Sequence, residues 1–241
     1  MIIQKISSTD SSIVCPKKLP KQQAFKGMRK PQELQKVPLK RALFEKFIYR
    51  VVKNLKKSKF SSSPEIKKIE QELSLEGINV RFNNDERLAE YITNGINILK
   101  SKGVDIPKNI VFAPSFLLKS GLAVWSKTFP QKEAPIILSK TIYKNTNNIS
   151  KLSSDHPNHT FFHETGHWLH FNNNFDPYRN YEIWRKKADP QRIEEVVSKR
   201  ASELEDGSEF CAEVFSGIMS GKTYPEDIIK LAKELKFPFE F

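Results

Sequence analysis

The chain has 241 residues, which is enough for one domain of moderate size with its own core and an additional arm. Its net charge of +12 is concentrated in residues 1–60, where 16 lysines and arginines stand against 3 acids, while the rest of the chain holds 24 against 25. The two cysteines are far apart and form no CxxC pair, so the composition excludes a disulfide scaffold and a cysteine-rich zinc module.

The chain contains no targeting or membrane segment that the sequence pattern can identify. The N-terminus lacks the continuous apolar stretch of a signal peptide, and no run approaches the ~20 apolar residues that span a bilayer. We therefore expect a product that is made soluble, without a transmembrane segment. It either stays in the cytoplasm or leaves the cell by a leaderless route.

Residues 1–37 are rich in Lys, Ser, Gln and Pro and show no sustained period, which predicts a flexible basic arm. A basic arm attracts acidic partners, whether protein, lipid or nucleic acid. Residues 1–60 contain few aromatic residues and no base-stacking pattern, so nucleic acid is not expected to be the main partner.

Residues 38–104 are predicted to form a helical N-terminal part. A helix begins at Pro38, and an apolar stripe with a period of four residues is expected to pack in the core: Leu39, Leu43, Phe47, Val51 and Leu55. A break at Ser61–Pro64 precedes a short helix to about Leu73. A further helix runs from Asp85 to Gly103, and its apolar face is Leu88, Tyr91, Ile92, Ile96 and Leu99.

Strands are predicted where β-branched or alternating apolar residues cluster between turn signals. These segments are Ile78–Phe82, Ile110–Phe112, Gly121–Lys127 and Pro135–Ser139. A polar loop over residues 144–155 follows. The remainder reads as helix, at about 157–173, 177–187, 190–204, 207–220 and 225–235. Strands followed by helices predict an α+β fold with a small mixed sheet and a helical half.

All five histidines fall within fifteen residues, and the central segment reads His163-Glu164-Thr165-Gly166-His167. Residues four apart on a helix share a face, so His163 and His167 can grip one Zn²⁺ ion. Glu164 follows the first ligand directly, where a carboxylate can take a proton from a water held by the metal without ligating the metal itself. The motif predicts a zinc site with Glu164 as general base.

The third protein ligand is not expected among the other histidines. His170 is seven residues from His163, roughly 10 Å along the axis, so a second-shell or surface role is expected for it. His156 and His159 are expected to precede the helix proper. Glu209 and Glu213 lie four apart in an otherwise apolar helix, and buried carboxylates need a partner.

In this interpretation Glu209 ligates the metal, and Glu213 accepts the free N–H of a ligand histidine and fixes its ring. The alternative is an ordinary amphipathic helix with both glutamates in water. Cys211 points away from that face and is expected in the core.

The HExxH motif with the downstream helix Glu209-Phe210-Cys211-Ala212-Glu213-Val214-Phe215 resembles the gluzincin metallopeptidases. The likeness is to zincin-like domains of phage minor head proteins and polymorphic toxins, and to the catalytic domain of anthrax lethal factor. It covers roughly residues 105–240. It implies a zincin-like domain over 105–241 with Glu209 as ligand, Glu164 as base and Glu213 as second shell.

The sequence departs from this pattern in one respect. Relatives often carry a Tyr shortly before the ligand glutamate, placed to stabilise the tetrahedral oxyanion, whereas residues 197–202 here contain none. Arg200 is the candidate donor in its place, and Tyr178 or Tyr181 are the alternatives from the preceding segment.

The sequence thus predicts a zinc metalloendopeptidase that uses one Zn²⁺ ion to hydrolyse peptide bonds of a protein or peptide substrate, in the manner of a toxin or effector protease. The substrate is expected to add to an edge strand of the sheet, either Gly121–Lys127 or Pro135–Ser139. The alternative is a non-catalytic zinc-binding interaction domain whose basic arm binds acidic partners.

Overall fold

The computed structural model describes residues 39–116, 118, 121–123, 133–144, 149–173 and 175–239, which belong to one compact unit, Pro38–Phe241. The basic arm lies outside the described residues. The boundary that we expected between residues 104 and 105 falls inside this unit.

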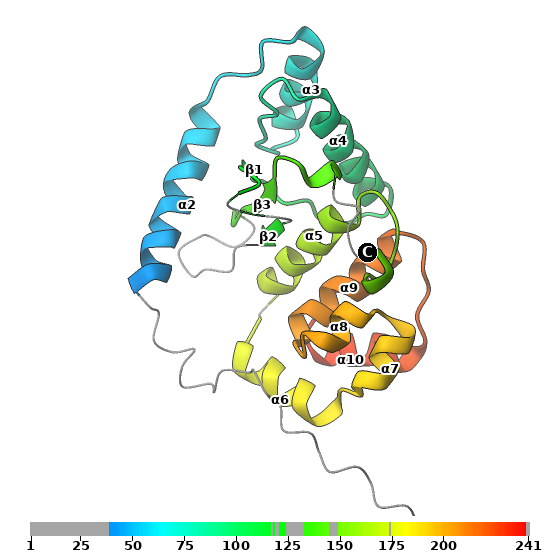
Figure 1. Ribbon diagram of the computed structural model, residues 1–241. Coiled ribbons are helices and arrows are strands. Elements are labelled where there is room, and N and C mark those ends of the chain that lie inside the picture. The colour runs from blue at the N-terminus through cyan, green and yellow to red at the C-terminus, as the bar shows by residue number, and fades with distance from the viewer. Residues whose placement is uncertain are drawn as a thin grey trace, which may run out of the picture. The chain divides into compact units, whose positions relative to one another are not determined.

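The described chain is mixed helix and sheet, and mostly helical (Figure 1). Three helices come first: α2 (Leu39–Lys57), α3 (Pro64–Leu75) and α4 (Glu86–Ser101). The strands follow as β1 (Ile110–Ala113), β2 (Gly121–Ala123) and β3 (Ile136–Ser139), with short 3-10 turns at Ile142–Lys144 and Ile149–Lys151. The helical half is α5 (His159–Asn172), α6 (Pro177–Lys187), α7 (Pro190–Val196), α8 (Lys199–Glu203), α9 (Gly207–Met219) and α10 (Glu226–Glu234).

The three-stranded sheet has the order β1-β3-β2, parallel between β1 and β3 and antiparallel between β3 and β2. Because β3 is hydrogen-bonded on both sides, the expectation that Pro135–Ser139 offers a free edge is wrong. β2 is one of the two outer strands and lies beside α5 (Figure 1). Residues 124–127 of the strand that we expected there lie outside the described residues.

The segment Ile78–Phe82 is not a strand, although its residues alternate as expected. It forms one isolated parallel bridge, between Asn79 and Asn109. The buried carboxylate of Glu70 accepts the Phe82 backbone N–H at 2.6 Å, together with the N–H and hydroxyl of Ser61, each at 2.7 Å. A side chain therefore takes the hydrogen bond that a neighbouring strand would have needed.

Over residues 46–57, whose side chains are described, helix α2 buries a different face from the one that we expected; the side chains of Leu39 and Leu43 lie outside the described part. Ile48 and Val52 are buried, whereas Phe47 is 58% exposed and Val51 and Leu55 are only half-buried. A four-residue spacing does not distinguish two adjacent stripes of one helix, and the contact with β1 selects the second. The expected face of α4 is confirmed, since Leu88, Tyr91, Ile92, Ile96 and Leu99 are all buried.

Capping residues set the starts of the later helices. Asp176 and Asp189 each precede a proline and accept backbone N–H groups of the first turns of α6 and α7. Ser198 accepts the Ala201 N–H at 3.0 Å and starts α8. The single helix expected over 190–204 is therefore two helices, because a serine inside the helical pattern serves as a new N-cap.

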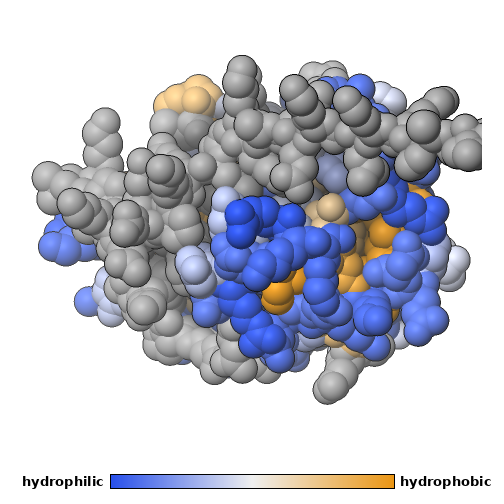
Figure 2. Space-filling model, turned by 90° about the horizontal axis from the view of Figure 1, so that it is seen from below, coloured by the Kyte–Doolittle hydropathy of each residue, from blue (hydrophilic) through white to orange (hydrophobic). Residues whose placement is uncertain are grey.

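Helices α5 and α9 pack closely against each other and form the centre of the helical half (Figure 1). Almost every residue of α5 is buried, including Phe161, Phe162 and Trp168. At Gly166 a Cβ atom would lie 3.0 Å from the Cα of Ala212, so the two backbones approach each other there. Seen from below, the described surface is mainly hydrophilic, with smaller hydrophobic areas between (Figure 2).

Phe237 of the C-terminal segment is buried and packs against Phe215 and Phe239. Among the described helices, none is both long and apolar enough to cross a membrane.

Candidate metal centre

His163 and His167 lie one turn apart on α5, and both are buried. Glu209 lies in the first turn of α9, which begins at the Asp206 cap. The close packing of α5 against α9 brings these side chains together, although more than forty residues separate them in sequence. Glu209 therefore lies on the side of α9 that faces α5, the helix with the HExxH motif.

The three side chains converge on a common point. The Nε2 atoms of His163 and His167 are 3.1 Å apart; that of His163 lies 3.3 Å from Oε2 of Glu209, and that of His167 lies 3.3 Å from Oε1. Ligands of a tetrahedral zinc ion at about 2.0–2.1 Å are roughly 3.3 Å from one another. Two imidazoles and a carboxylate are also a donor set that zinc prefers. This His/Glu group could hold a metal ion.

The electrostatics of the protein without a metal reflect this crowding. Burial by itself would lower the pKa of His163, but contacts with Glu209 and Glu213 outweigh burial and raise the pKa to about 10. The same contacts hold the pKa of Glu209 well below its ordinary value, against the effect of burial. A positive charge at this point is therefore favoured, and a metal ion would have to displace the proton that now supplies it.

Glu164 is buried on α5 beside the cluster, 4% exposed. Burial raises the pKa of this carboxyl group, while the neighbouring His163 and His167 act in the opposite direction. A carboxyl group with a raised pKa next to a possible metal site has the properties of a candidate proton acceptor.

Arg200 of α8 also contacts this cluster. Its Nε and Nη2 atoms each lie 3.4 Å from Oε2 of Glu209, and Nε lies 3.9 Å from Oε1 of Glu213. The structure thus brings Arg200 to the site but pairs it with the candidate ligand. Its oxyanion role stays a prediction. The alternatives Tyr178 and Tyr181 lie on α6, where Tyr178 is 57% exposed.

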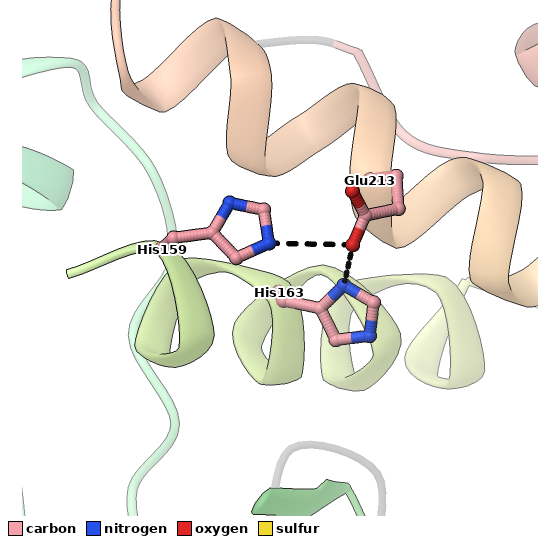
Figure 3. Close-up of side chains that lie close together, drawn as sticks. All are labelled: His159, His163 and Glu213. Carbon is pink, nitrogen blue, oxygen red and sulfur yellow. Dashed lines mark hydrogen bonds and ion pairs between the residues drawn. The ribbon is translucent and has the colours of Figure 1, made fainter. Parts of the chain in front are cut away.

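Glu213 lies one turn beyond Glu209 on α9 and is completely buried. Figure 3 shows its carboxylate between two rings of α5: Oε1 is 2.9 Å from Nδ1 of His163 and 3.3 Å from Nε2 of His159. Oε2 accepts the Ser153 backbone N–H at 2.7 Å. Burial alone would raise the pKa of Glu213, but its histidine contacts lower it well below the ordinary value. The position beside His163 is the one that the sequence predicted for Glu213.

The structure corrects the prediction for His159 and excludes one of the two alternatives for His170. His159 was expected before the helix proper, yet it is the first residue of α5 and contacts Glu213. Its spacing of four residues from His163 was the signal that could have identified it. His170 does not lie on the surface, because it is fully buried and its Nε2–H donates to the Leu235 carbonyl at 2.7 Å. Cys211 is buried in the core, as expected.

Comparisons of the chain with protein-family models, with curated proteins and with solved structures found no match. The case for a function therefore depends on the geometry of this site and on the pattern of its residues.

Proposed function

We propose that the protein is a zinc-dependent peptidase of gluzincin type, with His163, His167 and Glu209 as the zinc ligands. The observation that carries the proposal is the convergence of these three side chains, with contacts of 3.1–3.3 Å between their ligand atoms. They come from two helices, and the HExxH spacing and the glutamate helix of the sequence point to the same three residues.

When bound, zinc supplies Lewis acidity, which polarises the scissile carbonyl and makes water more acidic. Glu164 takes a proton from the attacking water and passes it to the leaving amine, a role that suits its raised pKa. Arg200 offers a positive charge beside the site for the oxyanion of the tetrahedral state. Glu213 holds the ring of His163 through its Nδ1 atom.

The zincin-like arrangement of residues 105–241 is part of the proposal. In this arrangement β2 is the strand with which a peptide substrate would pair. β2 is an outer strand of the sheet and lies beside α5, which carries the motif. An extended peptide paired with β2 would place its backbone along the motif helix. Substrates are therefore unfolded or loop segments of proteins.

The first test measures bound metal by native mass spectrometry in the parent, His163→Ala and Glu209→Ala. About one zinc ion per chain in the parent and a sharp reduction in both variants is the expected result. A parent that takes up no zinc when refolded with it would overturn the proposal.

The second test adds the zinc-loaded parent and Glu164→Gln to a proteome-derived peptide library and identifies new termini by mass spectrometry. Glu164→Gln is the matched control, because the amide has the size of the carboxylate, cannot accept the proton and leaves all three ligands in place. Cleavages are expected only with the parent. If neither protein produces new termini although both bind zinc, the protein is instead a non-catalytic zinc-binding interaction domain.

A further inference from the structure

Behind His163, on the side away from the candidate ligand Glu209, lies a buried polar cluster in which only Glu213 has a role in the proposed peptidase. It contains His159 and Glu213, with the hydroxyls of Ser154 and Ser216 beside them. His159 is 5% exposed, Ser154 is 8% exposed, and Glu213 and Ser216 are not exposed at all. Burying polar groups costs free energy unless each has a hydrogen-bond partner, so a buried cluster of this kind is a candidate for a functional role.

The partners of His159 determine which of its ring nitrogens carries the proton. Nε2 faces the Glu213 carboxylate at 3.3 Å, and a carboxylate can only accept. Nδ1 faces the hydroxyls of Ser216 at 2.9 Å and of Ser154 at 3.2 Å, and a hydroxyl can donate. Neutral His159 therefore donates from Nε2 and accepts at Nδ1.

Histidines of α5 and glutamates of α9 alternate along the contact between the two helices. Glu213 lies between His159 and His163, and Glu209 lies between His163 and His167. One level, with Glu209 between His163 and His167, is the candidate zinc site. The other level, with Glu213 between His159 and His163, is shown in Figure 3.

The second level also has side chains that could hold a metal ion, but occupation of both levels at the same time is unfavourable. His163 would have to use Nδ1 for that ion while its Nε2 ligates the first, which requires the loss of both ring protons. Glu213 already accepts the Ser153 N–H on Oε2 and faces both rings with Oε1. Hydrogen bonds hold His159 and Glu213 at this level without an ion, and Nδ1 of His163 lies 2.9 Å from Oε1 of Glu213.

We propose that His159 is a positioning residue for the metal site, acting through Glu213. Its Nε2–H, held in place by Ser216 and Ser154, keeps the Glu213 carboxylate oriented toward Nδ1 of His163. The carboxylate in turn keeps the His163 ring in the tautomer and orientation that present Nε2 to the zinc ion. This inference rests on the zinc site of the proposed function, but not on peptide cleavage.

The test measures the zinc dissociation constant by competition with a chromophoric chelator, in protein without any substrate. His159→Phe fills the space but cannot donate, and an outer-shell loss of this kind raises the dissociation constant about 10- to 100-fold. His159→Gln keeps an N–H donor near Nε2 and is expected to bind zinc almost as tightly as the parent. The matched control is His170→Gln, another buried histidine of α5, which should leave zinc affinity unchanged.

A double-mutant cycle separates positioning through Glu213 from a general disturbance of α5. In the Glu213→Gln background, His159→Phe should cause little further loss of zinc affinity, because the carboxylate through which it acts is gone. Additive losses would overturn the proposal, and so would unchanged affinity in folded His159→Phe. If that variant fails to fold, His159→Asn, whose amide is too short to reach Glu213, replaces it with the same expectations.

The outcomes distinguish this inference from the proposed function. A parent that binds zinc but cleaves nothing refutes the peptidase and leaves the cycle decisive for His159. A parent that cleaves peptides, with zinc affinity indifferent to His159, refutes only the positioning role. A parent that binds no zinc at all overturns both.

Discussion

The substitution Gly166→Ala tests the close approach of α5 and α9 on which the metal centre depends. Gly166 lies in the middle of the HExxH motif, and its helical backbone is one that alanine also adopts. On helix propensity alone, alanine should stabilise the protein by about 1 kcal/mol. The structure predicts the opposite sign, because the new Cβ would lie 3.0 Å from the Cα of Ala212 and 3.1 Å from a ring carbon of Phe215.

Ordinary contact begins near 3.4 Å, so the helices must separate by about 0.4 Å at this point. Overpacking of this kind costs about 1–3 kcal/mol, which leaves a net loss of about 1 kcal/mol after the propensity gain. The shift also moves His163 and His167 away from Glu209, so zinc affinity should fall as well.

Denaturant unfolding without metal gives the change in stability, and chelator competition gives the change in zinc affinity. Asn97→Ala is the control, since this exposed residue of α4 gains helix propensity without meeting a neighbour. If Gly166→Ala were as stabilising as the control and bound zinc like the parent, the close contact of α5 with α9 would be refuted.

Three further predictions concern the support of the fold and the metal. Glu70→Ala should lower the free energy of unfolding by roughly 2–5 kcal/mol, because three buried hydrogen bonds lose their acceptor. The exposed control Glu72→Ala should lower it little, and equal small losses in denaturant unfolding would contradict the role of Glu70. Burial lowers the pKa of His170 to about 4, below the ordinary value near 6.5, so the unfolded chain binds its proton first. Stability from this group is complete above pH 6.5 and falls by about 3 kcal/mol as the pH drops to 4. In metal-free protein the stability difference between parent and His170→Gln should change by that amount over this range, and a constant difference would refute it. Zinc at 100 times its dissociation constant should stabilise the parent and Glu164→Gln by about 2.7 kcal/mol in thermal melts, and Glu209→Ala far less; equal shifts in all three would place the ion elsewhere.

Much of the candidate site could be read from local spacing. Two histidines four apart in HExxH share a helix face in any fold, and so do Glu209 and Glu213. The starts of α6 and α7 were equally local, since Asp-Pro pairs cap helices through bonds within one turn. These features depend on residues within a few positions of one another.

The role of His159 could not be predicted from local spacing. Its spacing from His163 was visible, but its role depends on Glu213, more than fifty residues later, lying opposite it. The same holds for Arg200, whose contact with Glu209 depends on how α8 packs against α9.

The sequence by itself determined the helical pattern, the position of the motif and the residue types of a zinc site. Only the tertiary structure decided that β3 is central and β2 lies at an edge, that α2 buries Ile48 and Val52, and that Glu70 replaces a strand partner for Phe82. The physical reason is that periodicity shows which faces of an element are apolar, whereas burial and pairing depend on which other surfaces of the folded chain reach them.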